Sequence, residues 1–492
     1  MKHLLKLLLF IVITASALSA GDNVKKPNVV LIVSDDHGTN DLGCYGNDKI
    51  KTPNLDKLAE EGVRFVNAYA TSASCTASRS AILSGLYNHA NGLYGHSHHY
   101  HNFKAFEHVQ TLPVLLEKLA DYRTARVGKY HLAPESVYKF QTVLKANSRN
   151  SVEMSDKCKS FVSTSSDKPF FLYYCTSDPH RGGGIVEESK YKPDRFGNIE
   201  KGYDGIVKTE FDPADVIVPP YLPDNPECRA ELAQYYQSVA RMDQGIGLLF
   251  KHLKNSGEWE NTVIIYISDN GIAFPGAKTT VYQPGLNLPC IVKYNNSKGK
   301  NIVLNEMINW ADLTPTILDI AGVLITAEES LSSEYNNQKG NWDNTVNQKF
   351  HGRSFKSVLE GNSEDDWNET FGSHTFHEIT MYYPMRTVIT DKYKLIWNIA
   401  HYLPYPHASD LWESATWQSV INSENKMYAN KNVEKYTYRS EFELFDIVND
   451  PDEKNNLADN SEFNDTLEKM KAKLKEFQKR TNDPWVIKWE HE

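Results

Sequence analysis

The sequence predicts an α/β fold with a large domain, in which a mostly parallel sheet lies between helices, and a smaller C-terminal α+β domain with an antiparallel sheet. Short, wholly apolar runs alternate with helical patterns along the first two thirds of the chain. Runs of this kind are typical of strands covered on both faces, and their alternation with helices favours parallel pairing. The expected strands span residues 28–34, 124–128, 170–175 and 262–268.

The intervening helices are recognised by their end signals. Pro53 stands at the start of the helix expected over residues 53–61, and Gly62 follows its last residue. Proline is favoured in the first turn of a helix and glycine just after the last. The other helices are expected over residues 112–120, 231–253 and 312–321.

The pattern changes in the last third of the chain. Residues 327–348 are polar and rich in Asn, Ser and Glu, which predicts a surface loop leading out of the first domain. Residues 463–477 have the spacing of a closing amphipathic helix. We expect a large domain over residues 24–365 and a smaller one over 366–492. The short strands of its antiparallel sheet are expected at 370–376, 386–390, 394–398 and 443–446.

The charge of the chain and its N-terminal pattern exclude some classes of function. The 492 residues include 53 Lys+Arg and 63 Asp+Glu, for a net charge of −10, which argues against a general nucleic-acid binder. At the N-terminus, Lys2 and Lys6 precede a short apolar run and small residues, a pattern typical of a cleaved signal peptide. We therefore predict a signal peptide over residues 1–20 and an exported protein, periplasmic or secreted, without a membrane span.

Oxygen-bearing side chains follow two of the predicted strands. Asp35 and Asp36 come directly after residues 28–34, and Asp269 and Asn270 follow 262–268. The carboxyl ends of parallel strands form the ligand crevice of such a sheet. Carboxylate and amide oxygens suit Ca²⁺ or Mg²⁺ better than zinc. Each pair in isolation could be a turn or helix cap, but the repetition at two strand ends favours a metal site.

Cationic residues follow the other strands. Lys129 and His131 close residues 124–128 and share one face if the strand continues. Pro179 fixes the backbone before His180, after the strand at 170–175. Lys278 follows Asp269 by nine residues. A solvated lysine and a capping histidine are the alternatives, but together these residues would form a cage for a tetrahedral oxyanion.

A more specific signal surrounds Cys75. The string Cys75-Thr76-Ala77-Ser78-Arg79 continues to Leu83-Ser84-Gly85. A helix beginning near Cys75 would point free N–H groups at an anion, with Arg79 one turn on. The string resembles the sulfatase signature Cys-x-(Pro/Ala)-Ser-Arg-x-x-x-Leu-(Thr/Ser)-Gly. Four further strings resemble the sulfamidase (N-sulfoglucosamine sulfohydrolase) branch of that family, and they lie at residues 241–245, 313–319, 377–386 and 482–485.

The resemblance implies an alkaline-phosphatase-like catalytic domain that releases sulfate from a sulfated carbohydrate. It implies that a formylglycine-generating or sulfatase-maturating enzyme oxidises Cys75 to formylglycine, the nucleophile. It also implies a Ca²⁺ ion and, in many such proteins, a homodimer. The expected Ca²⁺ ligands are Asp35, Asp36, Asp269, Asn270 and the modified Cys75.

The same resemblance assigns the remaining catalytic roles. Arg79 and Lys129 would stabilise the hydrated formylglycine, and His131 would hydrogen-bond it. His180 and Lys278 would bind the sulfate and help to protonate the leaving group.

Two departures bear on the substrate. Lys278 stands where the sulfamidases carry Arg, and the loop 181–184 lacks the Cys and His of that branch. These changes favour a sulfate ester of a polysaccharide, such as the algal polymer ulvan. A heparan-type sulfamidase, a phosphonate or phosphodiester hydrolase and a non-enzymatic glycan-binding relative stay open.

Sugar contacts are expected from histidines and an arginine outside these motifs. We predict substrate contacts at His101, His377 and Arg386. The spacing of His96, His98, His99 and His101 does not match the paired ligands of a structural zinc site. We expect these histidines in a polar loop or a wall of the sugar pocket.

Overall fold

The computed structural model describes residues 25–182, 195–323 and 348–491. The predicted signal peptide and all but the last residue of the polar stretch 327–348 lie outside these ranges. Within them, no helix has the length and apolar content needed to cross a bilayer.

The large sheet has eight strands in the order β5-β4-β6-β1-β7-β8-β2-β9. Only β8 runs against its neighbours, so the predicted, mostly parallel sheet is confirmed. The strands are β1 Asn28–Ser34, β2 Val63–Phe65, β4 Arg123–Gly128, β5 Thr142–Leu144, β6 Phe170–Cys175, β7 Thr262–Ser268, β8 Cys290–Lys293 and β9 Ile302–Leu304.

The central strands lie in register. Val33 of β1 pairs with Cys175 of β6 on one side and with Ile267 of β7 on the other. Every residue of β1, β6 and β7 is buried, as their unbroken apolar sequences require. Because the three strands are parallel and in register, they end together at one edge of the sheet.

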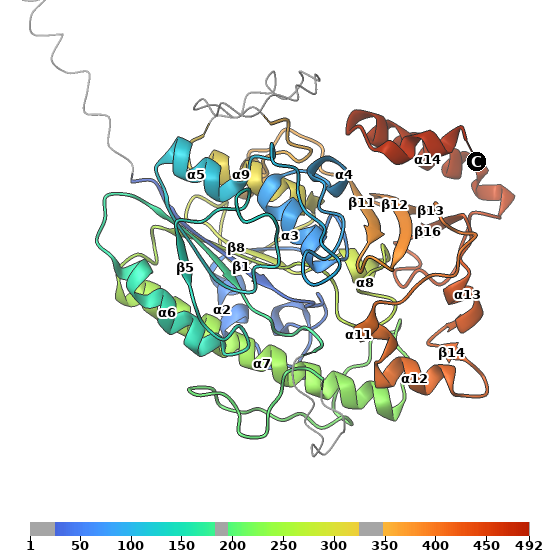
Figure 1. The fold of residues 1–492 in the computed structure, drawn as a ribbon, viewed down its shortest axis with the longest axis horizontal. Helices are drawn as coiled ribbons and strands as arrows, with labels where there is room; N and C mark the ends of the chain where they lie inside the picture. The colour runs from blue at the N-terminus through green and yellow to red at the C-terminus, as the bar shows by residue number, and fades with distance from the viewer. Residues whose placement is uncertain (1–24, 183–194, 324–347, 492) are drawn as a thin grey trace, which may run out of the picture.

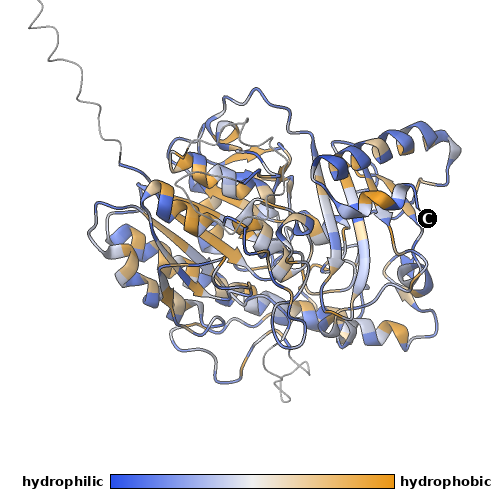
Figure 2. Ribbon diagram, turned by 45° about the horizontal axis from the view of Figure 1, so that its top comes forward, coloured by the Kyte–Doolittle hydropathy of each residue, from blue (hydrophilic) through white to orange (hydrophobic). Residues whose placement is uncertain are grey.

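Helices cover both faces of this sheet (Figure 1). One layer consists of α2 Pro53–Glu61, α6 Ser151–Ser163 and α7 Pro226–Asn255, and the other of α3 Cys75–Ser84, α5 Leu112–Ala120 and α9 Leu313–Ile320. Figure 2 shows the apolar strands between amphipathic helices whose polar faces point outward. The sequence prediction started α7 too late: Asn225 caps it by accepting a hydrogen bond from the Cys228 N–H.

The C-terminal part contains the predicted antiparallel sheet, in the order β11-β12-β13-β16. Helix α14 Asn464–Arg480 packs on β12 and β13, and Phe477 stacks on Phe371 with ring centroids 4.0 Å apart. The first of these strands begins at Glu369, whereas the domain boundary at residue 366 stays a prediction. The strands are β11 Glu369–Phe376, β12 Tyr382–Thr390, β13 Tyr393–Asn398 and β16 Phe442–Asp446.

Shorter elements complete the fold. They are η1 Gly43–Tyr45, β3 Ala68–Tyr69, α4 Asn88–Asn91, α8 Gln283–Leu286, β10 Ile308–Asn309, η2 Trp310–Asp312, α10 Lys356–Glu360, α11 Ser409–Trp412, α12 Ala415–Ile421, β14 Met427–Tyr428, β15 Lys431–Asn432, α13 Val433–Thr437, η3 Ser461–Phe463 and η4 Pro484–Trp489.

The two parts of the chain are joined by a buried carboxylate. Glu231 of α7 accepts hydrogen bonds from the backbone of Ala415 and Thr416, both at 3.0 Å, at the start of α12. The same carboxylate forms an ion pair with Arg181, whose guanidinium lies between Phe196 and Phe274. The expected effect of the 181–184 loop on sulfate binding therefore does not come from the Arg181 side chain, which is used in this joint.

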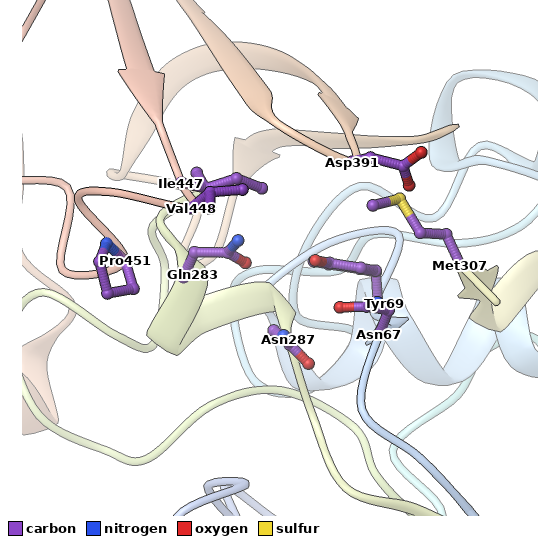
Figure 3. A pocket seen from close by; sticks show the side chains of 9 residues that line it. All are labelled: Asn67, Tyr69, Gln283, Asn287, Met307, Asp391, Ile447, Val448 and Pro451. Atoms are coloured by element: carbon purple, nitrogen blue, oxygen red, sulfur yellow. The ribbon is translucent and has the colours of Figure 1, made fainter. Parts of the chain in front are cut away.

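A cavity of about 340 Å³ lies between α8 and the C-terminal sheet (Figure 3). Its lining includes Tyr69, Gln283, Asn287 and Asp391. No Lys, Arg or His lines it, so an anionic group would find no cation there. This cavity is therefore a poor candidate for the predicted oxyanion site.

The C-terminal part has its own buried ion pair. Arg386 donates from Nε and Nη2 to Asp483 at 2.6 and 3.0 Å, and Nη1 donates to the Met385 carbonyl at 2.9 Å. Both side chains of the pair are buried. This arrangement argues against the predicted sugar contact at Arg386, because its guanidinium is enclosed and already paired.

We expect Asp483→Asn to lower the free energy of unfolding by about 3–5 kcal/mol, because it leaves the Arg386 charge buried without a counter-charge. Burial would raise the pKa of Asp483, but Arg386 outweighs it and holds this pKa below its ordinary value. The stabilisation is therefore complete above an unfolded pKa of about 4 and is lost as the pH falls toward the folded pKa. Urea unfolding at pH 7 and at pH 3 should show the deficit shrinking in acid.

Asp459→Asn, at an exposed site, serves as the control and should unfold like the wild type. An equal deficit for Asp483→Asn at both pH values would show that the ion pair is not its source.

Candidate active site

The predicted metal and oxyanion residues meet where the central strands of the large sheet end. Asp35 and Asp36 follow β1, Asp269 and Asn270 follow β7, and Lys129 follows β4. Cys75 is the first residue of α3. We call these residues, together with three others that contact them, the strand-end cluster: Asp35, Asp36, Cys75, Arg79, Lys129, His180, Asp269, Asn270 and Lys278.

Three carboxylates lie close together in the cluster. The Asp36 N–H donates to Asp269 Oδ1 at 3.0 Å, and Asn270 Nδ2 donates to Asp36 Oδ1 at 2.6 Å. Asp36 has a φ of 62°, a left-handed conformation that costs free energy in a residue other than glycine. These hydrogen bonds hold the strained residue with its carboxylate inside the cluster.

Two cations balance part of this charge. Arg79 contacts Asp269 Oδ2 from Nε and Nη2, both at 2.8 Å, and Lys129 Nζ lies 2.5 Å from Asp35 Oδ2. Burial raises the pKa of Asp269 to about 7, with Arg79 opposing. Burial acts in the same direction on Asp35, but the charges of Lys129 and Arg79 outweigh it and lower that pKa below its ordinary value. The neighbouring cations therefore stabilise the ionised form of Asp35 more than that of Asp269.

The residues present fit a hard divalent cation. Asp35 Oδ1 and Asn270 Oδ1 are buried and make no hydrogen bond within the described part of the chain. Ligand atoms of Asp35, Asp36, Cys75 and His180 lie within 4.8 Å of one another. A buried oxygen without a hydrogen bond requires another partner. Carboxylate and amide oxygens are the ligands that Ca²⁺ prefers. The predicted Ca²⁺ ligands therefore lie together, although the identity of the ion stays a prediction.

Cys75 lies at the N-terminus of α3, fully buried. Its Sγ is 3.6 Å from Asp36 Oδ1, so it borders the proposed ligand oxygens. Burial raises the pKa of its thiol well above the ordinary value, against the opposing effect of Lys129 and Lys278. An unmodified Cys75 is therefore a neutral thiol, which is a weak nucleophile.

Lys278 lies between the cluster and the C-terminal part of the chain. Its Nζ is 3.0 Å from Asp36 Oδ2, 3.3 Å from His180 Nδ1 and 2.8 Å from Asp410 Oδ2. Burial would lower the pKa of Lys278, but Asp36 and Asp410 outweigh it and raise this pKa well above its ordinary value. Lys278 is therefore protonated. Burial and the Lys278 charge lower the pKa of His180 well below its ordinary value, so His180 is neutral.

Sequence reasoning missed Asp410. It belongs to α11, far from the motifs in sequence, and nothing in its local sequence signals a site. The adjoining α12 is held on α7 through Glu231, and this brings Asp410 to Lys278. Only the tertiary structure shows that contact.

Histidines from three segments border Cys75. His377 Nδ1 lies 2.9 Å from Ser74 Oγ, and His96 Nδ1 lies 3.3 Å from Thr76 Oγ1. These two rings pack with centroids 4.0 Å apart. We call the set of packed rings the histidine wall, which comprises His96, His98, His101, His131 and His377.

Two predicted substrate residues therefore lie in this wall. His377 contacts the residue before Cys75, and His101 Nδ1 accepts the Ile379 N–H at 3.1 Å. His131, predicted to hydrogen-bond the nucleophile, packs on His96 and His98. Their roles toward a sugar stay predictions.

Comparison with known proteins agrees with this geometry. The chain is 36% identical to N-sulphoglucosamine sulphohydrolase of Homo sapiens over 474 residues, which covers 93% of this chain and 91% of the relative. It is 25% identical to an ulvan-active sulfatase of Formosa agariphila over 456 residues, or 91% and 78% of the two chains.

A solved structure shares the fold. It is a protein in complex with its substrate D-glucosamine-2-N,6-O-disulfate, with a TM-score of 0.66, 21% identity and coverage of 94% of this chain and 99% of that one. The family model described as Sulfatase matches residues 27–323, which include the whole strand-end cluster. The chain therefore belongs to the sulfatase family, has its alkaline-phosphatase-like fold, and is a sulfuric ester hydrolase.

Proposed function

We propose that this enzyme releases sulfate from N-sulfated glucosamine units of glycosaminoglycan-type oligosaccharides, with Ca²⁺ and a formylglycine made from Cys75. The supporting observation is the 36% identity to N-sulphoglucosamine sulphohydrolase along 93% of this chain. That match includes most of the C-terminal part, from which Asp410 and His377 reach the site. We also propose that the enzyme acts in the periplasm or outside the cell, which the predicted signal peptide supports.

A second candidate is the hydrolysis of O-sulfate esters in a polysaccharide such as ulvan. Lys278 supports it, because ester sulfatases of this family often carry lysine where sulfamidases carry arginine. The relative named for ulvan is the more distant one, at 25% identity. We therefore rank this substrate second.

The charge of the site suits a sulfate group. Around the site, Arg79, Lys129 and Lys278 face four carboxylates, those of Asp35, Asp36, Asp269 and Asp410. When all are ionised, one negative charge is in excess, and a divalent cation would turn this into one positive charge. That balance matches the single negative charge of a sulfate monoester or sulfamate.

The two absent groups would supply complementary chemistry. The oxygens of Asp35, Asp36, Asp269 and Asn270 would bind Ca²⁺. The bound ion would attract negatively charged groups to the site. Formylglycine would supply a hydroxyl nucleophile and a means of releasing the sulfate that serine lacks.

The chain's own residues position the sulfate and move the proton. Arg79 and Lys129 fix the carboxylates next to Cys75 and offer positive charge to sulfate oxygens. Lys278 is protonated and is held between Asp36 and Asp410. It can donate its proton to the departing nitrogen or oxygen. His180 Nδ1 lies 3.3 Å from Lys278 Nζ and also contacts Asp36, so the neutral ring helps to hold these two groups in place.

We expect Ca²⁺ to raise the melting temperature of the protein, because an ion bound only to the folded state stabilises it by about 2.7 kcal/mol at 100 times its Kd. Asp35→Asn should remove most of this shift, since it removes a carboxylate from the cluster. Asp48→Asn, at an exposed site, is the matched control and should retain the shift. A full Ca²⁺ shift in Asp35→Asn would place the ion elsewhere.

We expect Cys75→Ser to lower kcat/KM by about 10³-fold or more, because the serine hydroxyl cannot release sulfate once it carries the group. The protein is co-expressed with a formylglycine-generating enzyme, and free sulfate is measured from N-sulfoglucosamine and from ulvan oligosaccharides. The control is Cys44→Ser, since Cys44 is a partly exposed thiol outside the cluster.

Sulfate release from the N-sulfated sugar only would support the first candidate, and release from ulvan only would support the second. Mass spectrometry of the peptide containing residue 75 confirms the modification, so that inactivity is not mistaken for a wrong substrate. Full activity in Cys75→Ser would contradict both candidates.

We expect Lys278→Met to slow hydrolysis of the sugar substrate by about 10²–10⁴-fold, the range for loss of a general acid. An aryl sulfate with an acidic phenol needs little protonation, so its kcat should fall much less. Lys278→Arg gives the residue that the sulfamidases carry at this position, so it should retain most of the kcat on an N-sulfated sugar. Equal losses on both substrates would show that Lys278 only binds sulfate.

A further inference from the structure

We infer that part of the histidine wall is a second metal site, selective for a transition metal such as Zn²⁺, and that occupancy of this site inhibits the enzyme reversibly. The inhibition rests on the function proposed above, whereas the binding does not. The expected ligands are His96, His98 and His131.

The three imidazoles are already close enough to share one ion. Ligand atoms of all three lie within 4.8 Å of one another, and His131 Nε2 lies 2.6 Å from His98 Nδ1. Two nitrogens on one tetrahedral zinc are roughly 3.3 Å apart, given a Zn–N distance of about 2.0 Å. Side-chain adjustments of about 1 Å or less would therefore complete three ligands, with the fourth position open to water.

The spacing of the histidines in the sequence does not reveal this site. Among themselves, His96, His98, His99 and His101 do not have the spacing of a zinc motif. His131 comes from the segment after β4 and supplies the third ligand. His131 Nδ1 is buried and has no hydrogen-bond partner in the described chain, so this nitrogen is not used in another contact there.

The surroundings favour neutral, oriented rings. Thr76 Oγ1 contacts His96 Nδ1 at 3.3 Å, which leaves His96 Nε2 for an ion, as an outer partner commonly does for a metal-bound histidine. Burial lowers the pKa of His96, His98 and His131, with Lys129 acting in the same direction. The imidazoles are therefore neutral, which is the form that binds metals.

Charges on both sides of the wall act on a bound ion. Lys129 and Lys278 oppose it, and the nearby Glu378 favours it. The opposing charges disfavour a hard cation such as Ca²⁺, which prefers the oxygens of the strand-end cluster. A borderline ion such as Zn²⁺, Co²⁺ or Cu²⁺ gains more from imidazole nitrogen. The strand-end cluster should therefore bind Ca²⁺, and the histidine site should bind a transition metal.

Binding here would disable the active site. The wall touches the residues on both sides of Cys75, through Ser74 and Thr76. His131, the predicted hydrogen-bond partner of the nucleophile, cannot hold an ion and make that bond with the same nitrogen. The bound ion would also add positive charge and bulk beside Thr76, the residue next to Cys75.

The test uses the full protein loaded with Ca²⁺ and titrated with Co²⁺, in the wild type and in Cys75→Ser to exclude thiolate binding. We expect one equivalent of Co²⁺ to give the intense visible absorption of a tetrahedral site, and Zn²⁺ to abolish it. His98→Ala should weaken binding by about 10-fold or more, because it removes one ligand. His99→Ala, at the neighbouring exposed histidine, should bind like the wild type.

Equal Co²⁺ affinity in His98→Ala and His99→Ala, or only the weak spectrum of an octahedral oxygen site, would overturn the proposal. Inhibition by Zn²⁺ is then measured with the substrate that the enzyme turns over, and a chelator should restore the rate. An enzyme that binds Co²⁺ at these histidines but hydrolyses neither sugar substrate would contradict the proposed function and leave the metal site supported. Full activity at saturating Zn²⁺ would refute the inhibition.

Discussion

The site depends on one electrostatic constraint: three carboxylates are buried together at one edge of a parallel sheet. Asp35, Asp36 and Asp269 lie there because β1 and β7 are adjacent, parallel and in register. Like charges in a buried place are unfavourable unless cations lie between them. Arg79 and Lys129 meet this need in part, and the orphaned oxygens of Asp35 and Asn270 indicate that an ion completes it. The attraction for sulfate then follows from the same set of charges.

The large sheet supplies the carboxylates of the site, and the C-terminal part of the chain supplies Asp410, which contacts Lys278. The joint formed by Arg181, Glu231 and the first turn of α12 holds the two parts together. It also holds α11 so that Asp410 reaches Lys278. Lys278 therefore responds to carboxylates from both parts of the chain. One face of the small sheet packs on α14 in a cluster that also includes Tyr87 and Ala311 of the large domain, so this cluster is a second contact between the two parts.

Sequence patterns predicted four of the eight strands of the large sheet, β1, β4, β6 and β7, whereas β2, β5, β8 and β9 have only three or four residues each and show too little pattern to be recognised. The meeting of Asp35, Asp36, Asp269 and Asn270 could also be foreseen, because the ends of parallel strands lie at one edge of the sheet. The start of α7 was placed too late, since its first turn is polar and only the Asn225 cap marks it. The sequence predicts a sugar contact at Arg386, whereas the folded chain buries this side chain against Asp483. Asp410 and the gathering of His131 with His96 and His98 depend on tertiary contacts, which local patterns do not record.

The contact between Lys278 and Asp410 has a consequence for how enzymes of this kind diversify. Asp35, Asp36, Asp269 and Asn270 directly follow the most buried strands, β1 and β7, where substitutions are costly. Asp410 lies instead on a short helix near the surface, and its side chain is 20% exposed. Substitutions around α11 can change how firmly Lys278 holds its proton without disturbing the sheet. Evolution can thereby adapt the enzyme to a new leaving group through one peripheral segment while the anion-binding half is inherited intact.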